Sequence, residues 1–201
     1  MRLIGMLDSP YVRRAAISAQ MLGLPYQHES VSVFRTYDEF RAINPVVKAP
    51  TLVCEDGEVL MDSTLIIDYF EALAGTSLMP SELPLRRRAL KLIGLALTAC
   101  EKIVQTVYEG MRPADKRHAP WAERVNEQLY AALAELERDV AAQPLASSAD
   151  EIDQAGITVA VLWRFAQYNF ADKILAGDFP ALAAHSASAE TLPAFTATPL
   201  P

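Results

Sequence analysis

The strongest constraint on the fold of this 201-residue chain is a change of sequence pattern near residue 80. Before it, short apolar and β-branched runs alternate with helical patterns, whereas only helical patterns follow it. Turn-forming residues fill the stretch between them. The pattern therefore predicts an α/β domain over 1–76, a linker over 77–84 and an all-α helical domain over 85–201.

The first part predicts the element order β-α-β-α-β-β-α. Strands are expected over 3–7, 27–33, 51–54 and 59–61, and helices over 10–23, 37–43 and 62–75. A helix between the first two strands makes them parallel. Asp56-Gly57 between two β-prone runs predicts a hairpin, so the last two strands are antiparallel. The apolar residues of the last helix predict one buried stripe: Leu65, Ile66, Tyr69, Phe70 and Leu73.

The second part predicts a bundle of helices. Long patterns cover 85–111 and 125–140, and 157–168 is apolar nearly all round, which is typical of the centre of a bundle. Asp153 is expected to cap this central helix, with Ile152 and Ile157 placed as a hydrophobic staple.

Composition excludes several classes of protein. A net charge of −7 argues against nucleic acid as a partner. With only Cys54 and Cys100, no disulfide framework is expected, and the three histidines are too scattered for a metal site. The longest apolar run, 92–100, is far below the ~20 residues that span a membrane, and no secretory signal is visible. We expect a soluble, cytoplasmic protein with no metal.

The segment Ser9-Pro10-Tyr11, directly after the first predicted strand, has two interpretations. It can be a helix start, with Ser9 as cap and Pro10 at the first helical position. It also looks like the Cys-Pro-Tyr-Cys loop of glutaredoxin-like proteins without its sulfurs, with Asp8 free to act as the cap. No cysteine lies in this loop, so disulfide exchange there is excluded, and no G-x-S-x-G surrounds Ser9 to favour a hydrolase.

Three motifs in this order resemble the glutathione S-transferase family over essentially the whole chain. They are Ser9-Pro10-Tyr11, the loop 44–52, in which the family expects Pro50 to be cis, and the pair Asp62-Ser63. The resemblance implies a thioredoxin-like N-terminal domain and is closest to bacterial serine-type members with a theta-, zeta- or tau-like site. Gly156 departs from the family, which expects an acidic residue at that cap position.

The resemblance implies a glutathione site, with glutathione as cosubstrate. Ser9 would be catalytic, and Ser9, Lys48, Ala49, Pro50, Asp62 and Ser63 would bind the tripeptide. A free thiol has a pKa near ~8.5, and lowering it by about two units requires roughly 2.7 kcal/mol. A hydrogen bond to a charged group supplies ~1.5–3 kcal/mol and a helix N-terminus adds ~0.3–1. Ser9 at the start of a helix could therefore stabilise the thiolate.

The expected reaction is conjugation of glutathione to small hydrophobic electrophiles. Candidate contacts between the Ser9 loop and the first helix of the second domain are Tyr11, Tyr108 and Met111, with Arg112 for an acidic substrate. Tyr and Met at helical spacing are also common core residues, and a lone Lys48 is often simply solvated. The alternatives are glutathione-dependent isomerisation, dehalogenation or peroxide reduction, or a non-catalytic binding or regulatory protein. The resemblance also implies a homodimer.

Overall fold

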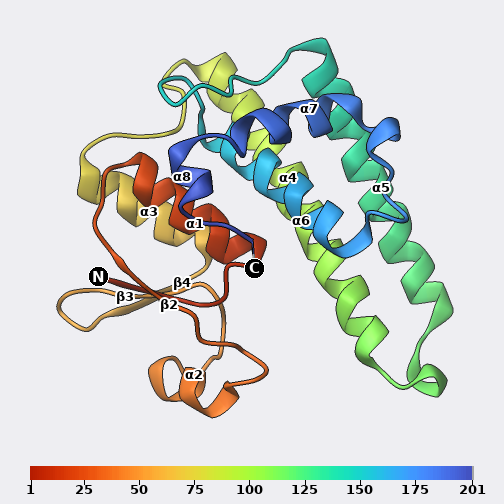
Figure 1. Ribbon diagram of the computed structural model, residues 1–201, viewed down its shortest axis with the longest axis horizontal. Helices are drawn as coiled ribbons and strands as arrows, with labels where there is room; N and C mark the ends of the chain where they lie inside the picture. The colour runs from red at the N-terminus through yellow and green to blue at the C-terminus, as the bar shows by residue number, and fades with distance from the viewer. Residues whose placement is uncertain (201) are drawn as a thin grey trace. The chain divides into compact units, whose positions relative to one another are not determined.

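In the computed structural model, which describes residues 1–200, a four-stranded sheet organises the N-terminal region (Figure 1). Its strands are β1 (Arg2–Ile4), β2 (Gln27–Glu29), β3 (Thr51–Val53) and β4 (Val59–Met61), in the order β2-β1-β3-β4. β1 pairs parallel with β2, and β3 pairs antiparallel with β4, which confirms the two predicted pairings. β3 also pairs antiparallel with β1, which joins the two pairs into one sheet. The first strand is shorter than predicted because Gly5 leaves extended geometry with φ 138°.

Helices cover both faces of this sheet. They are α1 (Pro10–Met21), α2 (Tyr37–Ile43) and α3 (Ser63–Ala74). Side chains alternate across a strand, so neighbouring residues of β1 enter different cores. Leu3 packs with α1 and α3, whereas Ile4 packs with Phe40 of α2. The thioredoxin-like fold expected from the sequence is thereby established.

The buried face of α3 differs from the predicted stripe. Ile66, Ile67 and Phe70 are buried, but Leu65 and Leu73 are 64% and 51% exposed. The buried face of α3 therefore includes Ile67 in place of Leu65 and Leu73. The cause is that α3 packs against α1 and the sheet over a narrower strip of its surface than its apolar residues cover. The helix ends at Gly75, whose φ of 65° is the left-handed conformation typical of a C-cap.

The chain divides into two units, an N-terminal unit, Met1–Leu78, and a helical unit, Met79–Glu190. The segment from Thr191 onward belongs to the N-terminal unit, although sequence analysis assigned it to the second domain. Its short helix α8 (Pro193–Thr196) packs on α1. Buried Arg13 donates to the Thr198 carbonyl at 2.8 Å and lies over the Phe195 ring, which explains this return of the chain.

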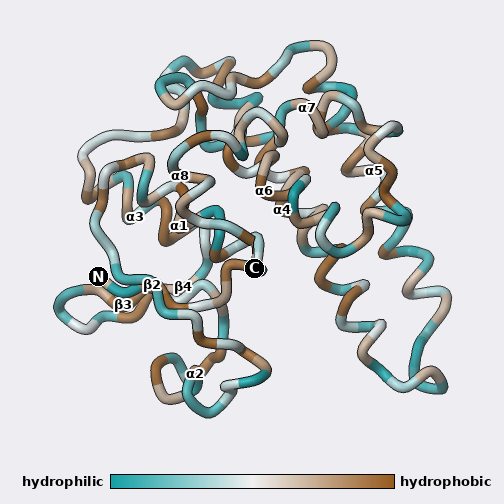
Figure 2. Tube along the Cα trace, viewed as in Figure 1, coloured by the Kyte–Doolittle hydropathy of each residue, from teal (hydrophilic) through white to brown (hydrophobic). Residues whose placement is uncertain are grey.

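The helical unit contains four long or medium helices and two 3₁₀ turns. These are α4 (Leu83–Met111), η1 (Ala114–Lys116), α5 (Ala119–Ala142), α6 (Gln154–Phe170), η2 (Ala176–Asp178) and α7 (Pro180–Ala189). Hydrophobic and hydrophilic stretches alternate along α4 and α5 in Figure 2, as expected of helices with one buried face. α6 packs on α4 and α7 and is buried nearly all round, which confirms its predicted central position.

The start of α6 confirms the predicted cap and explains the departure at Gly156. The Gly156 N–H donates to the Asp153 carboxylate at 2.8 Å. A Cβ on Gly156 would lie 2.9 Å from Cγ1 of Ile152, and the Gly156 carbonyl bonds Nε2 of buried His185 at 2.9 Å. A side chain at this position would crowd Ile152, so glycine suits this packing better than the acidic residue that the family expects.

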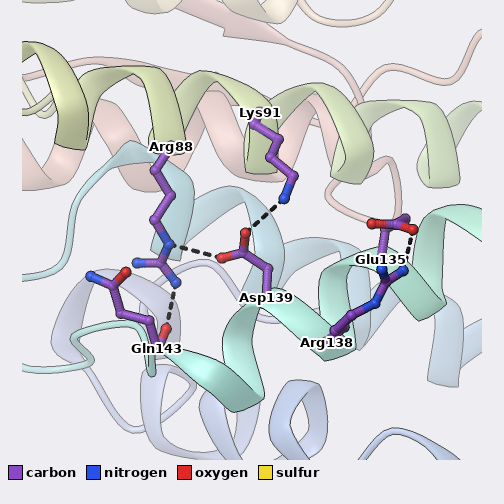
Figure 3. Close-up of polar contacts among 6 residues, drawn as sticks. All are labelled: Arg88, Lys91, Glu135, Arg138, Asp139 and Gln143. Atoms are coloured by element: carbon purple, nitrogen blue, oxygen red, sulfur yellow. Dashed lines mark hydrogen bonds and ion pairs between the residues drawn. The ribbon is translucent and has the colours of Figure 1, made fainter.

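Charged side chains connect α4 to α5 (Figure 3). Asp139 accepts hydrogen bonds of 2.8 Å from both Arg88 and Lys91, and Arg88 also donates to the Gln143 carbonyl. Burial alone would raise the pKa of Asp139, but the hydrogen bonds from Lys91 and Arg88 outweigh it and lower that pKa. Asp139 therefore remains a carboxylate that binds the two helices together.

Across residues 1–200, no helix combines the length and the apolar character needed to cross a membrane. No disulfide joins Cys54 and Cys100, of which the first is half-buried and the second is buried.

Candidate functional site

The register of the sheet brings three predicted motifs to one edge. Ile4 at the end of β1 lies opposite Thr51 at the start of β3, and Thr51 lies opposite Met61 at the end of β4. The segments that adjoin these residues therefore emerge at the same end of the sheet. They are the loop into Ser9, the loop that ends at Pro50, and the pair Asp62-Ser63.

Ser9 occupies the N-cap position of α1, and its side chain makes no capping hydrogen bond. Its backbone is extended, and its carbonyl accepts the Arg13 N–H at 3.0 Å. Pro10 fills the first helical position, where a missing N–H costs nothing. The backbone thus begins the helix, while the Ser9 hydroxyl is left for another partner at the positive end of α1.

The loop before β3 is held by a short network around a buried asparagine. Asn44 Oδ1 accepts the Val46 N–H at 3.0 Å, and Asn44 Nδ2 donates to the Thr51 hydroxyl at 2.8 Å. Thr51 in turn donates to the Lys48 carbonyl at 2.7 Å. The Ala49–Pro50 peptide bond is cis, as the sequence predicts. Sequence analysis did not identify Asn44 and Thr51 as the residues that shape this loop.

Gly5 explains how closely the first two loops approach each other. A Cβ on Gly5 would lie 2.6 Å from Cγ2 of Val12 and 3.2 Å from Cβ of Ala49. Its φ of 138° is also a conformation that other residues rarely adopt. Glycine at this position therefore allows the end of β1, the first turn of α1 and the cis-proline loop to pack together.

Asp62 and Ser63 form the N-terminus of α3. The Asp62 carboxylate accepts the Thr64 N–H at 2.8 Å, and Asp62 itself has φ 71°, which is uncommon for a residue with a side chain. Ser63 is buried and follows as the first helical residue. The arrangement presents a carboxylate, a hydroxyl and a helix N-terminus to one place, which suits a ligand carrying both an ammonium and a carboxylate.

A residue that sequence analysis missed contacts this pair. Arg14 on α1 is only 2% exposed, and its Nη1 donates to Ser63 Oγ and Thr64 Oγ1, both at 3.1 Å. The available signal was two adjacent arginines, Arg13 and Arg14, in a helical segment that is otherwise rich in small apolar residues. A long cation in such a segment must reach a polar partner on another element, since an unpaired buried charge is costly.

Comparison with known proteins relates the chain to one family. Residues 3–78 match the model of the glutathione S-transferase N-terminal domain. An uncharacterised GST-like protein, YibF of Escherichia coli K12, is 29% identical over 138 residues, 68% of each chain. Maleylacetoacetate isomerase of Pseudomonas aeruginosa is 33% identical over 93 residues, 44% of this chain and 43% of that protein.

A solved glutathione transferase family member from Pseudomonas fluorescens Pf-5, with bound glutathione, superposes with a TM-score of 0.85. It is 29% identical, and the match covers 100% of this chain and 98% of that one. The N-terminal unit thus matches the N-terminal domain of the glutathione S-transferase family, and the chain as a whole is similar to members of that family.

The remaining site residues predicted from the sequence differ in how exposed their side chains are. Lys48 is exposed beside the cis-proline loop, and Tyr11 is half-buried in the first turn of α1. Tyr108 and Met111 are 46% and 64% exposed at the C-terminal end of α4, so neither is a core residue of the helical unit.

Arg112, which was predicted to contact an acidic substrate, forms an ion pair within the chain. It lies 3.2 Å from a carboxylate oxygen of Glu109. The other Glu109 oxygen accepts the His118 N–H at 2.9 Å, and this bond chiefly, with Arg112 and Arg117, lowers the pKa of Glu109. Glu109 thereby ties the end of α4 to the start of α5. Within residues 1–200, no group of three or more metal-ligating side chains is found.

Proposed function

We propose that this protein binds glutathione at the edge of the sheet and activates its thiol through Ser9. The observation that carries the proposal is the Ser9 hydroxyl, which stands at the N-terminus of α1 without capping it. The register that brings the Ser9 loop, the cis-proline loop and Asp62-Ser63 to one edge supports it. The bound glutathione in the Pseudomonas fluorescens relative supports it as well.

Each part of glutathione has a chemically suited partner at this edge. The γ-glutamyl carboxylate would accept from Ser63 at the N-terminus of α3, and its ammonium would donate to Asp62. The cysteinyl unit would pair with backbone groups of Ala49, next to cis Pro50. Lys48 would reach the glycyl carboxylate. These contacts would place the sulfur toward Ser9.

The proposed role of Ser9 is to lower the pKa of the bound thiol. The Ser9 hydroxyl would donate to the thiolate, a charge-assisted bond of ~1.5–3 kcal/mol, and the α1 N-terminus would add ~0.3–1 kcal/mol. Together they supply the roughly 2.7 kcal/mol that a shift of two pKa units requires. Most bound glutathione would then be thiolate at neutral pH, which is the nucleophilic form.

The reaction we propose is attack of this thiolate on a small hydrophobic electrophile, with Tyr11, Tyr108 and Met111 as substrate contacts and Arg112 for an acidic one. A second candidate is glutathione-dependent isomerisation, favoured by the similarity to maleylacetoacetate isomerase. In isomerisation the thiolate adds to the substrate and leaves again, so glutathione is regenerated. Following glutathione consumption against several electrophile classes separates the two.

The decisive experiment measures the ionisation of bound glutathione. Thiolate absorbs in the ultraviolet, so difference spectra across a pH series give the pKa of the bound thiol. We expect a pKa lowered by about two units in the wild type, and a pKa higher by a unit or more in Ser9→Ala. Ser30→Ala, an exposed serine of the same unit, is the control. A fully protonated thiol at neutral pH in the wild-type complex would overturn the mechanism.

Binding itself is tested on immobilised glutathione. The proposal expects retention of the wild-type chain and its loss in Asp62→Ala. A protein that fails to bind glutathione would instead be a non-catalytic relative that uses the fold for other partners. The homodimer is a further part of the proposal, and light scattering of the purified chain checks it.

A further inference from the structure

Met61 lies where the hydrogen bonds that shape the cis-proline loop reach the surface. It is the last residue of β4, which is an edge strand of the sheet, and it is 37% exposed. Its sulfur accepts a hydrogen bond from Nδ2 of Asn44 at 3.8 Å. Asn44 itself is buried. A partly exposed methionine is therefore bonded to a buried amide.

The Asn44 amide connects this sulfur to the backbone of the loop before β3. Its nitrogen also donates to the Thr51 hydroxyl at 2.8 Å, and its oxygen accepts the Val46 N–H at 3.0 Å. Thr51 in turn donates to the Lys48 carbonyl at 2.7 Å. Because the amide is one planar group with its donors and its acceptor fixed to each other, it cannot turn at one bond without disturbing the others. A chemical change at the Met61 sulfur therefore acts on this loop.

The characteristic reaction of an exposed thioether is oxidation to the sulfoxide. A lone pair of the sulfur attacks one oxygen of a hydroperoxide, so that an S–O bond forms and the O–O bond breaks. The sulfur loses two electrons, and the proton of the attacked oxygen passes to the leaving oxygen. The peroxide is thereby reduced to water or, from an organic hydroperoxide, to an alcohol. The sulfoxide is polar and chiral, and reductases return it to methionine.

We propose that Met61 is a site of reversible oxidation by hydroperoxides, and that its sulfoxide weakens glutathione binding. The inference rests on the proposed glutathione site. A thioether sulfur is a weak acceptor, whereas a sulfoxide sulfur is electron-poor and carries an oxygen that accepts strongly. The Asn44 N–H is buried and needs an acceptor, so it must leave the sulfur for this oxygen. Turning the amide disturbs its bonds to Thr51 and Val46, and with them the loop.

The contact with Asn44 also determines which sulfoxide forms. A thioether sulfur has two lone pairs, and attack through one or the other gives opposite epimers. The Asn44 N–H occupies one lone pair of Met61, so the peroxide is attacked through the other. One epimer should therefore predominate at Met61. Met111 on α4 is 64% exposed and is the reference, because a side chain that lies largely in solvent should give both epimers.

Mass spectrometry of the wild-type protein tests the site. After treatment with hydrogen peroxide and digestion, we expect Met61 and Met111 to be oxidised first, ahead of the half-buried Met6 and Met21. The peptides are then incubated with each of the two classes of methionine sulfoxide reductase, which reduce opposite epimers. One class should restore most of Met61, whereas Met111 should need both. A Met61 that stays reduced while Met111 is oxidised, or equal epimers at Met61, overturns the inference.

Calorimetric titration with glutathione tests the consequence for binding. The oxidised protein is first freed of peroxide and incubated with dithiothreitol, which reverses sulfenic acids and disulfides of Cys54 and Cys100 but leaves methionine sulfoxide in place. We expect its affinity for glutathione to be about three- to tenfold lower than that of the untreated protein, the range of one neutral hydrogen bond.

Two variants separate Met61 from the other methionines. Met61→Leu keeps a similar apolar volume without sulfur, so peroxide treatment should leave its affinity unchanged. Met111→Leu lacks the more exposed sulfur, and it should lose affinity on oxidation as the wild type does. An oxidised wild type with unchanged affinity, or an equal loss in Met61→Leu, overturns the inference and leaves the proposed function standing. An untreated wild type that does not bind glutathione overturns the proposed function, and the regulation with it.

Discussion

The two units use buried and half-buried charge in different ways. In the N-terminal unit, buried Arg14 donates to the neutral hydroxyls of Ser63 and Thr64, at the start of α3. In the helical unit, Arg88 and Lys91 both donate to the single carboxylate of Asp139 (Figure 3). The first contact lies beside the proposed ligand site, and the second joins two helices of the bundle.

The comparison distinguishes residues proposed to bind glutathione from residues that stabilise the helical unit. In the helical unit, the Glu137 carboxylate likewise accepts the Ala181 and Leu182 N–H groups at 2.8 and 2.9 Å, and so caps α7 from α5. The carboxylates of Glu137 and Asp139 are thus both satisfied by donors on a neighbouring helix. Substitutions of these residues should therefore change the free energy of unfolding, whereas substitutions of Ser9 and Asp62 should change glutathione ionisation or binding.

The largest change in the free energy of unfolding is expected for Asp139→Ala, a substitution in the helical unit. The substitution leaves half-buried Arg88 and exposed Lys91 without their shared acceptor. We expect the free energy of unfolding to fall by about 2–3 kcal/mol, since each lost charge-assisted bond costs about 1.5–3 and the lysine can partly return to water. Urea unfolding followed by circular dichroism measures it, and glutathione affinity should be unchanged.

Glu135→Ala on the same helix is the control for Asp139→Ala. Glu135 pairs with Arg138 at the surface, and both side chains are largely exposed (Figure 3). An exposed pair of this kind contributes about 0.2–1 kcal/mol. Equal losses in the two variants would show that the Asp139 cluster is only another surface pair.

A smaller effect is expected at the start of α6 for Gly156→Ala. The new Cβ would lie 2.9 Å from Cγ1 of Ile152, so packing must shift at a cost of about 1–3 kcal/mol. Alanine regains up to about 1 kcal/mol of helix propensity, which leaves a net loss of about 1 kcal/mol. Gly94→Ala on α4 is the control, because nothing lies within 4 Å of its Cβ and the same propensity should stabilise the protein. Thermal unfolding of the two variants should shift in opposite directions.

Much of the fold follows from patterns that local chemistry produces. The hairpin at Asp56-Gly57, the cap at Asp153 and the central position of α6 depend on short-range rules, and the structure has all three. The return of residues after 190 to α1 could not be predicted. It depends on Arg13 and Phe195, which are 182 residues apart in the sequence.

The residues of the candidate site also fall into a group that could be predicted from the sequence and a group that could not. Ser9, Pro50 and Asp62 stand in recognisable local motifs, whereas the roles of Arg14, Asn44 and Thr51 arise only from contacts between elements. An arginine in a helix gives no sign of which neighbouring element it will reach. Contacts of this kind depend on packing, which no short pattern encodes.

The last prediction concerns pH and the helical unit alone. Burial lowers the pKa of His185 most strongly, although its bond to Gly156 and the charge of Asp153 oppose this. The unfolded chain therefore binds a proton on His185 at a higher pH than the folded chain, so stability falls as the pH drops below about 6.5. Between pH 6.5 and 5.5 the loss from this residue is at most about 1 kcal/mol.

Replacing His185 by glutamine separates this titration from packing. His185→Gln can keep a donor to the Gly156 carbonyl, and it cannot bind the proton. Urea unfolding of the variant should show a flatter dependence on pH between 5.5 and 6.5 than the wild type. An unchanged slope would mean that another group titrates in this window. Since His185 lies in the helical unit, the pKa of bound glutathione should be the same in both proteins, which keeps the two units distinct in function.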